Sequence, residues 1–66
     1  MKLGNKIRQM RKNAGYTQDQ LAEKLGVSAQ SISKWEQGIS YPSILYLVPL
    51  TKILDCTLEE LLKDLN

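Results

Sequence analysis

Residue types that cross-link small proteins are nearly missing from this 66-residue chain, which has one cysteine and no histidine. Cys56 alone cannot form a disulfide within the chain, and zinc sites built from cysteine and histidine are excluded. Domains of this size otherwise depend on regular helix packing or on association with a second chain. We therefore expect a single domain over residues 1–66 that holds no metal and no other cofactor.

Long apolar runs are missing as well. The longest, Ile44–Leu50, has seven residues and includes Tyr46 and Pro49, whereas a helix needs ~20 apolar residues to span a bilayer. The first residues lead straight into charged side chains, without the apolar stretch of a signal peptide. We expect a cytoplasmic protein that does not bind a membrane, and a lone reduced thiol fits that compartment.

The net charge of +2 is too small to indicate a nucleic-acid partner, but the charges are unevenly distributed. Residues 1–18 carry five basic and no acidic side chains, whereas residues 55–66 carry four acidic and one basic side chain. The basic end would face any polyanion. An ordinary solvated surface explains the charges equally well, so the pattern alone does not decide.

Glycines and helix caps predict an all-α fold of five short helices, because the sequence shows no strand-like alternation. The expected helices cover residues 3–13, 17–25, 28–37, about 43–54 and the segment from residue 57 onward. Thr17 with Gln20 and Thr57 with Glu60 have the spacing of capping boxes, and Ser28 is a cap for the third helix. The last helix carries a stripe of leucines, namely Leu58, Leu61, Leu62 and Leu65.

Pro49 conflicts with the fourth helix. Inside a helix it would clash with the carbonyl of Leu45 and remove a hydrogen bond, at a cost of about 3 kcal/mol. A helix that begins near Tyr46 would place Pro49 in its first turn, where proline is tolerated. We therefore predict a late start of this helix or a kink in it.

Residues 18–37 contain two amphipathic helices joined by a turn at Gly26, with the small residue Ala22 where the helices must approach closely. The residues spaced to face a shared core are Leu21, Leu25, Val27, Ile32 and Trp35. This pattern is typical of a helix-turn-helix. The alternative is a helical hairpin with no nucleic-acid role. It explains less well why glycine lies in the turn and alanine in the first of the two helices.

The outward face of the third helix offers amide, hydroxyl, methyl and ammonium groups, and no acid. Its members are Ala29, Gln30, Ser33 and Lys34, with Gln37 as a further candidate. These groups match the donors, acceptors and thymine methyls in the major groove of DNA. The alternative is a plain solvated face, but such faces usually mix glutamate with lysine. We predict that this face reads bases.

Phosphate contacts are expected around the helix ends. The amino end of the second helix offers the amides beyond Thr17 and the side chain of Gln18. The other expected phosphate contacts are the hydroxyls of Ser28, Ser31, Ser40 and Tyr41 and the charge of Lys6, to which Lys34 can add its own. Neutralising several phosphates should make binding depend strongly on salt.

Most of the chain is similar to one known family. The matching residues are Tyr16–Ser28 (YTQDQLAEKLGVS), Gln30–Gly38 (QSISKWEQG), Tyr41–Ser43 and Leu58–Leu62. On these residues the chain resembles the lambda-repressor-like, Xre/Cro-type helix-turn-helix family. The resemblance implies a compact five-helix domain that binds operator DNA as a dimer.

The resemblance also implies roles for single residues. Gln18 would hold a backbone phosphate and support the recognition helix, while Arg11 and Glu36 would form a structural ion pair. The implied base-reading positions are those of Ala29, Gln30 and Lys34. Two residues depart from the family pattern: Ala29 replaces a polar base reader found in some members, and Pro49 is unusual in its helix.

The sequence thus predicts a sequence-specific transcriptional regulator, a repressor, that binds double-stranded DNA as a homodimer over half-sites about 10 base pairs apart. It shows no catalytic constellation, so we do not expect an enzyme. The alternative is a protein-interaction or antitoxin-like adaptor with the same fold. The apolar residues of Ile44–Leu50 and the leucines of the last helix suggest it, although they would serve a homodimer interface equally well.

Overall fold

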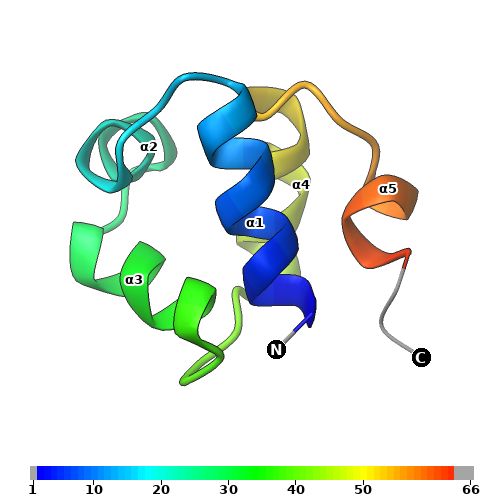
Figure 1. The fold of residues 1–66 in the computed structure, drawn as a ribbon. Coiled ribbons are helices and arrows are strands. Elements are labelled where there is room, and N and C mark those ends of the chain that lie inside the picture. Colours follow the sequence, from blue (N-terminus) through cyan, green and yellow to red (C-terminus); the bar gives the residue numbers. More distant parts are fainter. Residues whose placement is uncertain (1, 64–66) are drawn as a thin grey trace.

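The computed structural model describes residues 2–63, which form five α-helices and no strand (Figure 1). The helices are α1 (Lys2–Asn13), α2 (Gln18–Leu25), α3 (Ala29–Gln37), α4 (Ile44–Ile53) and α5 (Leu58–Leu62). The predicted all-α class is confirmed. Leu65, the last leucine of the predicted stripe, lies outside the described residues. None of these helices is long and apolar enough to cross a membrane.

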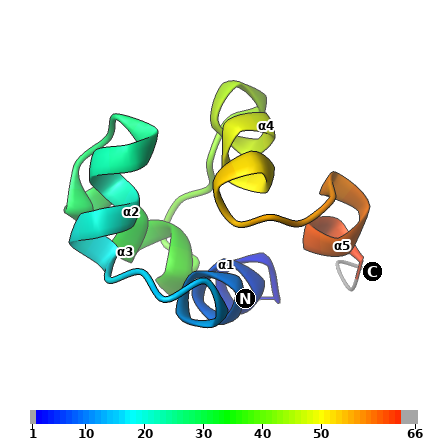
Figure 2. The same cartoon turned by 90° about the horizontal axis from the view of Figure 1, so that it is seen from above.

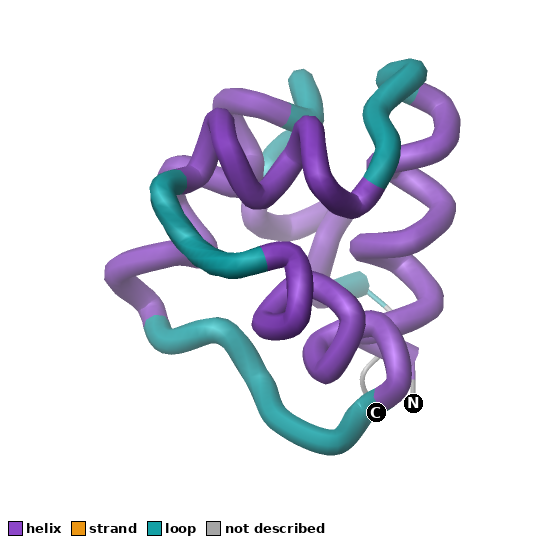
Figure 3. The backbone as a smooth tube through the Cα atoms, turned by 90° about the vertical axis from the view of Figure 1, so that its left-hand side faces the viewer, coloured by secondary structure: helices purple, strands orange, loops and turns teal. Residues whose placement is uncertain are grey.

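In Figure 1 the α1 helix stands in front of α4, with α2 and α3 to its left and α5 to its right. Seen from above, α4 lies across from α1 and closes the space between α2 and α5 (Figure 2). A short turn joins α2 to α3, and these two helices pack against each other. A longer connection leads from α3 to α4 (Figure 3).

Each helix contributes one completely buried side chain to the core. These residues are Ile7, Leu21, Ile32, Leu50 and Leu61. Of the residues predicted to face the core between α2 and α3, Trp35 is also buried, whereas Leu25 and Val27 pack against the core and stay partly exposed. Burying one large aliphatic side chain stabilises the fold by about 1.5–3 kcal/mol. Each of the five helices is therefore held to the core by at least one such side chain.

The helix ends follow the predicted chemistry, with one exception. Both capping boxes form, and Ser28 accepts a hydrogen bond from the Ser31 amide. Three helices end at a glycine with positive φ, at Gly15, Gly26 and Gly38. After α4 the same left-handed position is taken by Asp55, with φ 54°, and the Cys56 amide closes the turn on the Thr51 carbonyl. This non-glycine stop was not predicted.

The predicted late start of the fourth helix was wrong. The amides of Tyr46 and Leu47 both donate to the Ser43 carbonyl, at 2.9 and 3.0 Å, so α4 begins at Ile44 and Pro49 lies inside it. Complete burial of Leu50, with partial burial of Leu47, offsets the cost of the proline, which is about 3 kcal/mol. The early start adds Ile44 and Leu45 to the helix, and these two residues are 61% and 79% exposed.

The α1 helix also lies unusually close to the carboxyl end of α3. A Cβ atom at Gly4 would lie 2.5 Å from the carbonyl oxygens of both Trp35 and Glu36. Any larger residue would push the two backbones apart. Gly4 thus fixes where α3 ends relative to the rest of the fold, a role that the sequence alone did not reveal.

Candidate nucleic-acid interface

The residues on the outward face of α3 differ in how far their side chains are exposed. Gln30, Lys34 and Gln37 are exposed, whereas Ala29 and Ser33 are only partly exposed. Ala29 packs against the core, and Ser33 accepts a hydrogen bond of 2.7 Å from Gln37 Nε2. Gln30 and Lys34 are therefore the two predicted base readers whose side chains are exposed and make no hydrogen bond that competes with DNA.

The hydroxyls at the start of α3 are already partnered with each other. Ser28 Oγ lies 3.0 Å from Ser31 Oγ and also accepts the Ser31 amide at 3.1 Å. These contacts fix the turn between α2 and α3. A phosphate that approaches this turn would have to share the two hydroxyls with the cap.

The amino end of α2 is held by its capping box. Thr17 Oγ1 accepts the Gln20 amide at 3.0 Å, and Gln20 Oε1 accepts the Thr17 amide at 2.9 Å. Helix geometry gives the amides of Gln18 and Asp19, the first two of α2, no acceptor within the helix. These amides carry the positive end of the helix dipole, which attracts anions.

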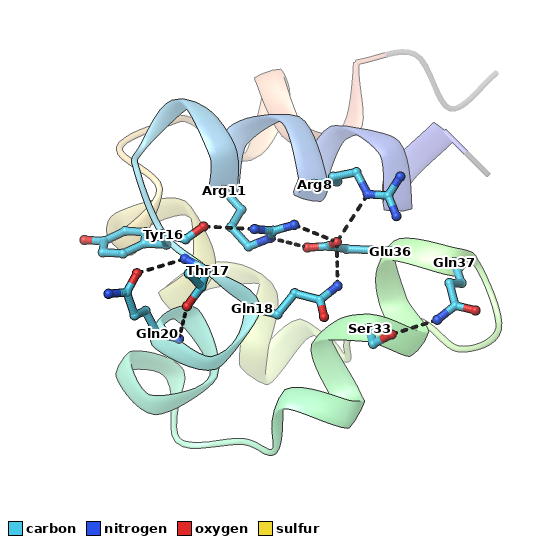
Figure 4. Close-up of polar contacts among 9 residues, drawn as sticks. All are labelled: Arg8, Arg11, Tyr16, Thr17, Gln18, Gln20, Ser33, Glu36 and Gln37. Carbon is cyan, nitrogen blue, oxygen red and sulfur yellow. Dashed lines mark hydrogen bonds and ion pairs between the residues drawn. The ribbon is translucent and has the colours of Figure 1, made fainter.

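Behind α3 lies a cluster of polar side chains, Arg8, Arg11, Gln18 and Glu36, which we call the Glu36 cluster (Figure 4). Arg11 binds Glu36 with two nitrogens, Nε to Oε2 at 2.6 Å and Nη2 to Oε1 at 3.2 Å. The Glu36 side chain is completely buried and that of Arg11 is 10% exposed. Arg11 Nη1 also donates to the Tyr16 carbonyl at 2.9 Å, which ties the end of α1 to the start of α2.

Two more donors reach the same carboxylate. Gln18 Nε2 lies 3.0 Å from Glu36 Oε1, and Arg8 Nε lies 3.5 Å from that oxygen. Gln18, expected to support the recognition helix, therefore contacts it directly from the amino end of α2. The contribution of Arg8 was missed. Its spacing of three residues from Arg11, which puts both on one face of α1, was the available signal.

Burial alone would raise the pKa of Glu36. Hydrogen bonds from Arg11 and Gln18, the charge of Arg11 and a hydrogen bond from Arg8 outweigh it, so the pKa is lowered from the ordinary value of 4.5. Glu36 is therefore ionised at neutral pH and joins three helices at one point. The recognition helix is thus anchored from the side that faces away from solvent.

The remaining predicted phosphate contacts lie elsewhere. Hydrogen bonds within the Thr57 capping box lower the pKa of Glu60, and the charge of Lys6 lowers it further, so Lys6 lies near the start of α5. Ser40 and Tyr41 lie in the connection from α3 to α4, and Tyr41 is 56% exposed. The structure thus brings Gln18 next to α3 but places Lys6 on the side of α1 toward α5.

An exposed apolar surface adjoins this face. We call it the α4 patch, and its residues are Ile39, Tyr41, Ile44, Leu45, Tyr46 and Val48. Leu45 is 79% and Ile39 66% exposed, and residues 38–51 carry no charge. The patch meets α3 where the Tyr46 ring lies 5.7 Å from the Trp35 ring, centroid to centroid.

Comparison with known proteins identifies this arrangement. A family model described as helix-turn-helix matches residues 7–61. The chain belongs to the helix-turn-helix family. The resemblance seen in the sequence is confirmed, and α2 and α3 are the two helices of the motif, with α3 in the position of the recognition helix.

Two curated relatives are bacterial regulators. The chain is 44% identical over 62 residues to the transcriptional activator BcrR of Enterococcus faecalis, covering 94% of this chain and 30% of BcrR. It is 44% identical over 55 residues to the transcriptional regulator DicA of Escherichia coli, covering 83% of this chain and 41% of DicA. The chain therefore spans less than half the length of these helix-turn-helix relatives.

A solved structure extends the likeness to three dimensions. The P22 c2 repressor protein, in a complex with a synthetic operator, matches with a TM-score of 0.86 and 38% identity. The match covers 92% of this chain and 92% of that one. The helix arrangement around α2 and α3 is thus that of a repressor domain whose structure was solved on DNA.

Proposed function

We propose that this protein is a sequence-specific transcriptional regulator that inserts α3 into the major groove of double-stranded DNA. The observation that carries the proposal is the charge pattern of α3. Its only carboxylate, Glu36, is completely buried, so the exposed amide of Gln30 and ammonium of Lys34 meet no negative charge on their own helix. Amides pair with adenine and ammonium groups with guanine in that groove.

The amino end of α2 supplies the first phosphate contact in this proposal. Gln18 lies there with the first amides of the helix, and its hydrogen bond to Glu36 links the phosphate site to the recognition helix. A phosphate bound at Gln18 would therefore fix the position of α3 in the groove. The similar P22 c2 repressor was solved in complex with a synthetic operator, which supports DNA as the ligand.

We propose further that the protein binds DNA as a homodimer. The α4 patch supports this, because a twofold axis places the same surface of two copies against each other and an uncharged apolar surface matches itself. An adaptor function, in which another protein covers the patch, is the competing outcome. Sedimentation of the free protein and of its DNA complex distinguishes two copies from one.

Repression is the proposed direction of regulation, because occupying an operator requires only the DNA-binding surface described above. The names of the relatives include both an activator and a repressor, so a reporter gene placed behind the selected operator is the deciding measurement. The proposal assigns no catalytic step to the chain. It places the protein in the cytoplasm, where a bacterial cell holds its DNA.

The test of DNA binding is selection from a random duplex library, followed by footprinting. We expect a palindromic consensus with half-sites about 10 base pairs apart and binding that weakens as salt rises. Recovery of no consensus, together with binding that does not depend on salt, would refute the proposal. A consensus of a single half-site would refute the homodimer alone.

A further inference from the structure

The Glu36 cluster holds one arginine more than its charge requires. Glu36 carries a single negative charge, and Arg11 already pairs with both of its oxygens, at 2.6 and 3.2 Å. Arg8 reaches the carboxylate through Nε alone, at 3.5 Å, and its side chain is 51% exposed. The cluster therefore has an excess positive charge, and that charge lies on Arg8 at the surface.

The position of Arg8 relates this charge to the amino end of α2. Arg8 and Gln18 donate to the same oxygen, Glu36 Oε1, so their donor atoms lie within two hydrogen-bond lengths of each other. The two Nη atoms of Arg8 point away from the carboxylate (Figure 4). A guanidinium fork thus lies beside the candidate phosphate site with most of its donors directed elsewhere.

We propose that Arg8 is a phosphate ligand, which binds a DNA backbone phosphate beside the one held at the amino end of α2. This inference rests on the proposed function and extends it to a second phosphate. The planar fork of arginine matches phosphate oxygens with two parallel hydrogen bonds. Since Arg11 alone neutralises Glu36, Arg8 can turn to a phosphate without leaving a buried charge unpaired.

The test uses the variant Arg8→Gln and the matched control Lys52→Gln, which removes one charge from an exposed residue at the end of α4. Affinity for a mixed-sequence DNA duplex about 20 base pairs long is measured over a range of salt, since phosphate contacts do not depend on sequence. Each lost phosphate contact makes the slope of log affinity against log salt shallower by about 0.9. Between about 50 and 200 mM salt the parent should thus lose about threefold more affinity than Arg8→Gln.

Further variants separate a phosphate ligand from a structural residue. Lys52→Gln should keep the slope of the parent, and Arg8→Lys should restore the slope that Arg8→Gln loses, because the charge returns without the fork. The urea midpoint of Arg8→Gln should stay near that of the parent, since the contact with Glu36 is long and half-exposed.

Three results would overturn the inference. Equal slopes for Arg8→Gln and Lys52→Gln would show that Arg8 does not bind a phosphate, without contradicting the proposed function. A lowered urea midpoint with an unchanged slope would make Arg8 a structural residue. A parent protein that binds the duplex without salt dependence would overturn both the inference and the proposed function.

Discussion

The α3 and α4 helices have nine and ten residues, and each follows a serine, yet their exposed side chains differ in polarity. Ser28 caps α3 with its side chain, whereas Ser43 makes no such bond to α4. The outward side of α3 carries amides, hydroxyls and a lysine, while that of α4 carries isoleucine, leucine, valine and tyrosine. One helix is thus suited to polar base edges and the other to an apolar protein surface.

The two helices also differ in how they are held. Polar contacts from α1 and α2 converge on Glu36 in α3, whereas α4 carries an interior proline and is held by its apolar inward face. A helix that reads bases must keep its side chains in fixed positions, because a small displacement misplaces every hydrogen bond at once. An apolar contact surface tolerates small shifts, since its attraction has no preferred direction.

The largest expected effect is the loss of the anchor of α3. In Glu36→Gln the charge of Arg11, which is 10% exposed, loses its partner, and breaking a buried ion pair in this way costs about 3–5 kcal/mol. That is comparable to the whole stability of a domain this small, roughly 3–10 kcal/mol. We expect the variant to be largely unfolded by circular dichroism. Glu23→Gln, on the exposed side of α2, is the control, and equal urea midpoints for the two would contradict the assignment.

The same anchor predicts how stability depends on pH. The pKa of Glu36 is lowered in the folded protein, so its contribution is complete above the unfolded value of about 4.5 and is lost as pH falls through the folded pKa. Urea unfolding should therefore show a falling free energy of unfolding at acid pH. A midpoint that rises on acidification would mean that Glu36 is not stabilised as the carboxylate.

Next in size is the loss of base contacts from the outward side of α3. Gln30→Ala and Lys34→Ala should each weaken binding to the selected operator by about 1–3 kcal/mol and relax the preference for one base pair. Lys52→Ala, which removes a positive charge at the end of α4, should change neither the affinity nor the preference. Operator titrations with single base-pair substitutions make the measurement. Unchanged base preference in both α3 variants would show that other residues read the sequence.

The α4 patch offers a smaller and separable effect. Leu45→Lys places a charge at a residue that is 79% exposed, so folding should change by no more than about 0.5 kcal/mol. Association of two copies should weaken by more than about tenfold, because an unpaired charge is costly in an apolar interface. Gln9→Lys adds the same charge on the exposed side of α1 as the control. Identical sedimentation of both variants would show that the α4 patch is not the dimer interface.

The smallest effect concerns how α4 ends. Asp55 has φ 54°, a conformation that glycine adopts without strain at the end of α3. Asp55→Gly should stabilise the protein by about 0.5–1 kcal/mol. Asp55→Asn removes only the charge at this carboxyl end of a helix. A thermal midpoint no higher for the glycine variant than for the asparagine variant would show that the conformation costs nothing.

The sequence predicted best what depends on residues close together in the chain. Capping boxes at Thr17 and Thr57 and glycines at three helix ends need only a few neighbours, so the helices were located closely. Features that depend on packing were missed or wrong. The late start expected for α4 was wrong, since the helix begins at Ile44, and the closeness of Gly4 to α3 exists only once the chain is folded.

The interface divides in the same way. The types of side chain on α3 indicated base reading, but the sequence did not show that Ala29 packs inward or that Ser33 is engaged by Gln37. Arg8 was overlooked because its excess charge is visible only beside the pair formed by Arg11 and Glu36. Ion pairs between residues far apart in the chain decide which charged side chains are neutralised within the fold and which remain available to bind DNA.

The contact between Trp35 and Tyr46 gives the protein an optical reporter of its own. Trp35 is the only tryptophan, it is 6% exposed, and its ring lies 5.7 Å from a tyrosine of the α4 patch. Its emission therefore senses both the recognition helix and the apolar surface beside it. Fluorescence recorded while DNA or a second copy is added would follow each event without any attached dye.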